Sequence, residues 1–324
     1  IGAGDEIITT SRTFIATSSA AVSLGAIPVF IDVEIDSGNI NAKEIEKYIS
    51  RKTKAISIVH FAGWPADVIE ISKIAKKFNL FLIEDCSQAH GAKILVKNEF
   101  RSVGYFGDVS TWSFCQDKII STGGEGGMIT TNDKSIWKKV WSYKDHGKDY
   151  DTVFDKSHEP GFRWLHESVG SNCRLTEMQS SIGLDQLKNL NKWIEIRNRN
   201  AKILKEYLSD CELLRIPEVS KNIIHAYYKF YCFLKLEQLN NEWNRNRIIH
   251  EINNTGFPAF HGGCSEIYLE KCFNKQNMRL SERLVNAKIL GDTSLMFLVH
   301  PTINKEEICE YAITIKKILK LASK

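Results

Sequence analysis

The first half of the chain alternates short runs of β-branched and other apolar residues with longer segments of helical periodicity. This alternation is typical of βαβ units, which build a mainly parallel sheet covered by helices. We therefore predict a large α/β domain. Its expected strands are residues 6–10, 27–33, 54–60, 81–85, 109–114 and 127–131, and its expected helices are residues 14–24, 43–50 and 66–78.

The second half changes in character at residue 134. Residues 134–172 are aromatic, rich in Gly, His and Asp and weakly periodic, so we interpret them as an irregular functional loop or partner contact. A long helical pattern at 176–208 then links to an α+β lobe. That lobe has expected strands at 225–235 and 295–299, a helix at 242–254 and a terminal helix from residue 306. We divide the chain into a large domain, 1–190, and a linker helix with a small domain, 191–324.

Composition narrows the class of protein. Lys and Arg total 43 against 39 for Asp and Glu, without a long run of one sign, so no nucleic-acid footprint stands out. The eight cysteines form no CxxC pair or Cys/His ligand group, which argues against a metal site and favours a reducing, cytoplasmic setting. No apolar stretch approaches the roughly 20 residues of a membrane span.

Two segments carry candidate chemistry. In FLIEDCSQAHGA, a predicted strand ends in the carboxylate of Asp85, and in STWSFCQDKIISTGGEGGM a predicted strand is followed by Lys118 and a Gly-rich turn. A desolvated lysine amine is suited to imine chemistry, and a carboxylate at a neighbouring strand end can hold a pyridinium proton. The same residues are also consistent with a helix cap, a solvated lysine and an ordinary turn.

Six motifs occur in order along the chain and together indicate a resemblance to one known family. They are GDEIITTSRTFIATSSAAVSLGAIPVFIDV, TKAISIVHFAGWPADV, IEDCSQAHGA, SFCQDKIISTGGEGGM, DHG and SNCRLTEMQSSIGLDQL. Together they resemble the DegT/DnrJ/EryC1/StrS family of nucleotide-sugar aminotransferases. The resemblance implies the aspartate aminotransferase-like fold type I and pyridoxal 5′-phosphate as cofactor, with pyridoxamine 5′-phosphate as the intermediate. It also implies a homodimer with shared active sites that serves polysaccharide, O-antigen or glycan biosynthesis.

The resemblance also assigns roles to individual residues. Lys118 matches the lysine that forms the aldimine with the cofactor and then shuttles a proton, and Asp85 matches the partner of the pyridine nitrogen. Gln88 is expected near the ring and its phenolic oxygen, and Ser113 matches a phosphate ligand. Phe14 matches the aromatic residue that stacks on the ring, although a core aromatic on a helix face is the alternative.

Three further residues are expected around the site. Asn172 matches a residue that reaches the phosphate of the neighbouring subunit, with an ordinary turn residue as the alternative. His261, in FPAFHGGCSEIY, matches a histidine-containing loop of the sugar site. Glu125 lies in the Gly-rich loop, where it either contacts substrate or braces the turn.

The resemblance also directs the choice of substrate. The GEGGM string favours a 4-keto-6-deoxy sugar on a nucleoside diphosphate, with glutamate as the amino donor, over a 3-keto sugar. A dehydratase or regulatory protein on the same fold is the alternative, but the dehydratase branch replaces the lysine with histidine, so Lys118 argues against it. Family members carry a helix and a phosphate-binding turn before the equivalent of Gly4. Because the printed chain starts at Ile1, we expect an upstream segment.

Overall fold

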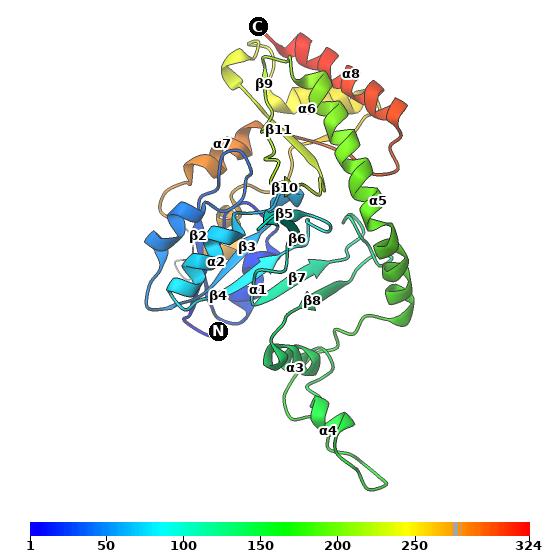
Figure 1. Cartoon of the computed structure of the whole chain (residues 1–324). Coiled ribbons are helices and arrows are strands. Elements are labelled where there is room, and N and C mark those ends of the chain that lie inside the picture. The colour runs from blue at the N-terminus through cyan, green and yellow to red at the C-terminus, as the bar shows by residue number, and fades with distance from the viewer. Residues whose placement is uncertain (275–277, 279) are drawn as a thin grey trace.

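The computed structural model describes residues 1–274, 278 and 280–324. Its first half is built on a six-stranded sheet of order β2-β1-β3-β4-β7-β8 (Figure 1). The first five strands in this order run parallel, and β8 pairs antiparallel with β7. The strands are β1 (Glu6–Thr10), β2 (Ile27–Ile31), β3 (Thr53–Val59), β4 (Phe81–Asp85), β7 (Val109–Ser113) and β8 (Gly127–Thr130).

Helices on the faces of this sheet enclose its core. They are α1 (Ala16–Ser23), the 3₁₀ segments η1 (Ala42–Tyr48) and η2 (Phe61–Gly63), and α2 (Val68–Lys77). Asp67 caps α2 by accepting a hydrogen bond from the amide of Glu70, and the apolar face of α2 is buried. The predicted helix at 43–50 is a short 3₁₀ segment instead, started by the side chain of Asn41, which accepts from the amide of Lys43.

A small hairpin, absent from the sequence prediction, lies beside the main sheet. Strands β5 (Lys93–Val96) and β6 (Glu99–Ser102) pair antiparallel, and β10 (Ile223–Ile224) adds a third strand. Lys97 and Asn98 have φ of 48° and 67°, which is the backbone that a two-residue hairpin turn requires.

The segment 134–172 was predicted wrongly as irregular throughout. It contains α3 (Lys134–Tyr143) and α4 (Tyr150–Phe154), and Asp133 caps α3 by accepting from the amides of Ser135 and Ile136. Figure 1 shows these helices in an arm that projects from the body of the molecule. The side chains of Phe162 and Trp164 in this arm are 82% and 85% exposed.

The long helix α5 (Glu177–Leu208) joins the two halves and begins at a capping box formed by Thr176 and Gln179. Its middle, at Ile194, packs in the core of the first sheet. Its last two turns, with Leu204 and Leu208, pack in a second core. The predicted domain boundary at residue 190 therefore falls inside α5, and the two-domain division remains a prediction.

The second core lies on a four-stranded antiparallel sheet of order β12-β13-β11-β9. Its strands are β9 (Leu214–Arg215), β11 (Phe230–Leu234), β12 (Ala259–Phe260) and β13 (Ser294–Phe297), and its helical segments are η3 (Leu236–Gln238), α6 (Arg245–Asn254), η4 (Ile267–Leu269), η5 (Lys271–Asn274), α7 (Val285–Thr293) and α8 (Lys305–Ala322). None of the helices in the described part of the chain combines the length and the apolar character needed to cross a membrane.

The strand predicted at 225–235 is only half as long as expected. It begins at Phe230, because Tyr227 has a φ of 45° and its amide donates to Nδ1 of His225, which turns the chain just before the sheet. This turn carries Tyr228 and Lys229 towards the first sheet rather than into the second.

Candidate active site

A cavity of about 500 Å³ lies where the two halves of the molecule meet. One wall comes from the segments that follow β1, β4 and β7, whose carboxyl ends share one edge of the sheet because the strands are parallel. The other wall comes from the second lobe, from Tyr228, Lys229 and Tyr231 and from Phe260 and residues 262–264. Among the lining residues are Phe14, Gln88, Asp117, Lys118, Tyr228 and Lys229.

Lys118 lies in this cavity with its side chain only 15% exposed. Its Nζ is 3.5 Å from Oδ1 of Asp117 and 5.1 Å from the ring centroid of Tyr228. The Tyr228 hydroxyl donates to Oδ2 of Asp117. Burial raises the pKa of Asp117, but the bond from Tyr228 and the charge of Lys118 outweigh it, so the pKa is lowered overall. The carboxylate is thus held ionised beside the lysine amine.

Asp85 is the last residue of β4, as predicted, and its carboxylate is held from two sides. Oδ2 accepts a 2.8 Å hydrogen bond from Oγ1 of Thr17 on α1, and Oδ1 accepts a 3.0 Å bond from the amide of Ser87. Gln88, three residues on, accepts from the amide of Ala62 with its side-chain oxygen at 2.7 Å. Its NH₂ group therefore remains as a donor for a molecule in the cavity.

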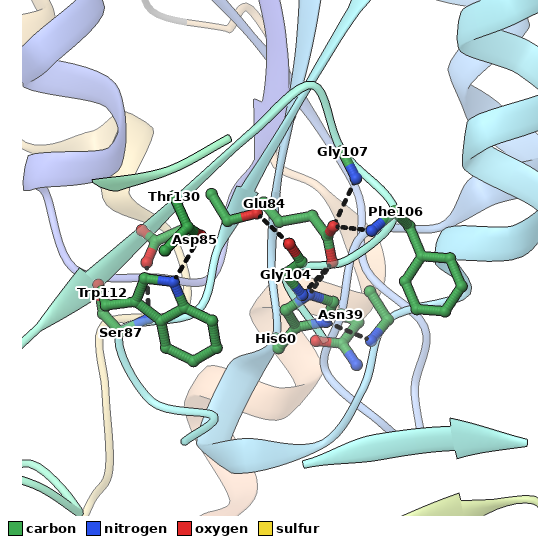
Figure 2. Close-up of polar contacts among 12 residues, drawn as sticks. Asn39, His60, Glu84, Asp85, Ser87, Gly104, Phe106, Gly107, Trp112 and Thr130 are labelled. Atoms are coloured by element: carbon green, nitrogen blue, oxygen red, sulfur yellow. Dashed lines mark hydrogen bonds and ion pairs between the residues drawn. The ribbon is translucent and has the colours of Figure 1, made fainter. Parts of the chain in front are cut away.

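A buried network surrounds Glu84, the residue that precedes Asp85 on β4 (Figure 2). The side chain of Glu84 is fully buried and accepts backbone hydrogen bonds from Gly104, Phe106 and Gly107 at 2.6–2.8 Å. Nε2 of His60 is 3.0 Å from the same carboxylate. Burial raises the pKa of Glu84, but these hydrogen bonds outweigh it and the pKa is lowered overall. The network fixes the end of β4 and the turn before β7.

His60, Glu84 and Cys86 place potential ligand atoms within 4.8 Å of one another. Nδ1 of His60 accepts from the amide of Ala66, so Nε2 carries the proton that is donated to Glu84. Both ring nitrogens and both Glu84 oxygens thus have protein partners, and burial raises the pKa of the Cys86 thiol. This donor set is a hydrogen-bond network rather than a prepared metal site.

Phe14 follows β1 and lines the cavity with an exposure of 69%. The alternative reading of Phe14 as a core aromatic is therefore wrong, because so exposed a ring is not packed in a core. Ser113 ends β7, and its hydroxyl accepts from the amide of Cys115 at 3.3 Å. Ser113 is outside the residues that line the cavity.

Besides Asp85 and Ser113, three further expected site residues lie outside the cavity lining. His261 is exposed, with Nε2 2.9 Å from Oδ1 of Asn246, while its neighbours Phe260 and Gly262 line the cavity. Glu125 is exposed and contacts the Cys115 thiol at 3.5 Å. Asn172 is exposed on the projecting arm, where its backbone forms an isolated bridge with Asp145. Within a single chain, none of these three residues thus lines the cavity that contains Lys118.

The sequence analysis missed the wall contributed by the second lobe. Asp117 and Tyr228 are 111 residues apart in sequence, so no local pattern links them. The segment HAYYKF offered one signal, since a lysine between two aromatic residues at the start of a buried strand is unusual for a core position. That signal indicates Lys229 as a further residue of the cavity.

The fold and this cavity define an α/β enzyme with a lysine at the carboxyl edge of its sheet. The family model described as "DegT/DnrJ/EryC1/StrS aminotransferase family" matches residues 1–315. The chain belongs to this family. The predicted fold type, enzyme class and cofactor are thereby confirmed, since these are pyridoxal phosphate-dependent aminotransferases.

Known relatives support this membership. The chain is similar to a solved aminotransferase from Psychrobacter cryohalolentis, with 48% identity, a TM-score of 0.95 and coverage of 99% of this chain and 82% of that one. It is 34% identical to GDP-perosamine synthase of Escherichia coli O157:H7 over 81% of this chain and 66% of the relative. It is 31% identical to UDP-N-acetyl-3-dehydro-alpha-D-glucosamine 3-aminotransferase of Acidithiobacillus ferrooxidans over 98% of this chain and 79% of the relative.

Proposed function

We propose that this aminotransferase transfers an amino group from glutamate to a keto-sugar carried on a nucleoside diphosphate, and that Lys118 binds the cofactor. One observation carries the proposal: Lys118 lies in a 500 Å³ cavity together with Gln88 and Phe14, while Asp85 ends the neighbouring strand β4. A primary amine, a free amide donor, an exposed aromatic face and a fixed carboxylate are the groups that pyridoxal phosphate requires.

Each of these residues has a distinct task. When bound, pyridoxal phosphate would supply an electron sink at the reacting carbon of the donor or the sugar. Asp85 holds a proton on the pyridine nitrogen, and its bonds from Thr17 and Ser87 fix its orientation. Gln88 would donate its NH₂ to the ring oxygen, and Phe14 would cover one face of the ring. The Nζ of Lys118 removes a proton from the substrate carbon and returns one.

For the acceptor we propose a 4-keto-6-deoxy sugar, used in polysaccharide, O-antigen or glycan biosynthesis in the cytoplasm. The GEGGM segment and the similarity to GDP-perosamine synthase support this choice. A 3-keto sugar is the second candidate. It is favoured by the relative named for a 3-dehydro sugar, which matches almost the whole of this chain. Both relatives are named for nucleotide-linked sugars, so a nucleotide carrier is common to both candidates.

We also propose that the enzyme is a homodimer with shared active sites. The projecting arm exposes Phe162 and Trp164, and Val169 near them is 94% exposed, which is typical of a surface that a partner covers. Asn172 lies on the same arm and not at the cavity of its own chain. In a two-fold dimer the arm can deliver Asn172 to the partner's cofactor phosphate, next to Ser113 of that subunit.

Reduction with borohydride tests the central assignment. The full-length protein is expected to be yellow, and reduction should attach the cofactor to the peptide that contains Lys118. Lys118→Arg should abolish the labelling, whereas Lys235→Arg, a change at an exposed lysine, should leave it intact. Label on another lysine would refute the assignment. Incubation with glutamate and a panel of nucleotide-linked 3-keto and 4-keto sugars, followed by mass spectrometry, decides the acceptor.

A further inference from the structure

Lys229 is a second lysine in the wall of the active-site cavity. It immediately precedes β11, where the turn at Tyr227 directs it towards the first sheet, and its side chain is half-buried. The Nζ of Lys229 lies over the ring of Tyr228, 4.8 Å from the ring centroid. No ion pair within 4.0 Å involves Lys229 in the part of the chain that the structure describes.

Asp117 is the carboxylate whose charge acts on Lys229, but its two oxygens already have other partners. Its Oδ2 accepts from the Tyr228 hydroxyl, and its Oδ1 lies 3.5 Å from Lys118. Burial lowers the pKa of Lys229, and the charge of Asp117 opposes this only in part. A partly desolvated ammonium without a close carboxylate is unfavourable unless an anion from outside the chain completes the site.

The two contacts with the ring of Tyr228 set an upper limit on the distance between Lys229 and Lys118. The Nζ atoms of Lys118 and Lys229 are 5.1 and 4.8 Å from the same Tyr228 centroid, so they are at most 9.9 Å apart. In an amino-acid donor, the carboxylate is two bonds from the nitrogen that takes the place of Lys118. A charge-assisted hydrogen bond adds about 2.8 Å. Lys229 is therefore no more than 9.9 Å from the reacting amine, which is within reach of the charged groups of a substrate that extends this far from Lys118.

We propose that Lys229 is the anion-binding residue of this cavity and holds a charged oxygen of the substrate, either a carboxylate of the amino donor or a phosphate of the nucleotide sugar. This inference rests on the proposed function, because it assumes that the substrates react at Lys118. Both substrates are anions that occupy the cavity in turn. One cationic side chain in its wall can serve either of them, and in either case it orients the substrate without taking part in proton transfer.

Binding of unreactive probes to the holoenzyme tests the proposal. Glutarate represents the donor carboxylates, and UDP and GDP represent the nucleotide phosphates, each titrated by calorimetry against wild type, Lys229→Met and Lys229→Arg. Lys229→Met keeps the length of the side chain but removes its charge. It should raise the Kd of at least one class of probe tenfold or more, equivalent to about 1.4 kcal/mol. Lys229→Arg should recover much of this loss, and exposed Lys235→Met is the matched control.

The two classes of probe separate the two sources of the anion. Loss of glutarate binding alone assigns Lys229 to the donor, and loss of nucleotide binding alone assigns it to the sugar nucleotide. The proposal is overturned if Lys229→Met binds both classes as wild type does. It is also overturned if both Lys229 variants change the cofactor absorbance and melting temperature, which indicates a structural role. If wild type shows neither cofactor absorbance nor probe binding, the proposed function itself fails.

Discussion

The substitution Glu84→Gln probes the buried network around Glu84. In the native chain Oε1 accepts from the amides of Phe106 and Gly107, and Oε2 accepts from Gly104 and His60. Glutamine replaces one oxygen with an NH₂ group of nearly the same size. Whichever way the amide is turned, this donor faces two other donors, so the change removes hydrogen bonds without creating a cavity.

The expected loss of unfolding free energy in Glu84→Gln follows from the number and type of hydrogen bonds lost. Each hydrogen bond to a charged group contributes about 1.5–3 kcal/mol, so two lost bonds correspond to roughly 3–6 kcal/mol of unfolding free energy. His60 cannot relieve the conflict by changing tautomer, because its Nδ1 must accept from the amide of Ala66. The loss should also loosen the end of β4, where Asp85 lies.

Urea unfolding followed by circular dichroism measures this free energy. Glu99→Gln is the matched control, since Glu99 is exposed and forms an ion pair with exposed Arg101, and it should change stability by less than about 0.5 kcal/mol. Because the pKa of Glu84 is lowered in the folded state, its contribution is present above about pH 4.5 and is lost as the pH falls through the folded pKa. The difference in unfolding free energy between wild type and Glu84→Gln should therefore become smaller as the pH falls below about 4.5. A Glu84→Gln protein within 1 kcal/mol of wild type at pH 7 would refute the reasoning.

Three other predictions concern the cofactor, the dimer and acid stability. Asp85→Ala should leave circular dichroism unchanged but lower kcat about a thousandfold, equivalent to roughly 4 kcal/mol, and near-normal turnover would mean that the carboxylate is misassigned. Inactive Asn172→Ala and Ser113→Ala homodimers should regain up to about half of the activity per heterodimer when mixed, and no recovery would mean that each site takes both residues from the same chain. Burial lowers the pKa of His90 to about 4 and that of His225 to about 3, against about 6.5 when unfolded. Acidification from pH 7 to 5 should therefore cost about 2 kcal/mol of unfolding free energy for each, and a flat pH profile in denaturant titrations would contradict this.

The first sheet was predictable because its strands are short apolar runs ended by polar residues. β4 has the predicted bounds, since Phe81–Asp85 changes abruptly from apolar to acidic, and the long periodic pattern identified α5. The hairpin of β5 and β6 was missed because residues 99–102 are all exposed and carry no alternating pattern. α3 was missed because its aromatic residues were taken as signs of a loop, although Ile136, Trp137, Val140 and Trp141 have helical spacing.

The candidate site also has a part that the sequence predicted and a part that it did not. Lys118, Gln88 and Asp85 were predictable because each follows or ends a strand of one parallel sheet, so topology alone brings them to one edge. The opposite wall depends on how the second lobe is placed. Tyr228 and Lys229 reach the cavity through a turn in which Tyr227 has a left-handed backbone conformation. The apolar pattern of the sequence had predicted a strand at this turn. Contacts of this kind are set by tertiary packing rather than by local sequence.

Helix α5 has a consequence for how the molecule loses its structure. Leu190 and Ile194 pack in one hydrophobic core, whereas Leu204 and Leu208 belong to the other, and Leu204 is less than three turns beyond Ile194. A helix of 32 residues extends for about 48 Å, and its central hydrogen bonds cannot open without releasing side chains from both cores. Opening one half therefore weakens the other. Amides in the middle of α5 are thus expected to exchange with solvent only through global unfolding, while those of the projecting arm exchange through local opening.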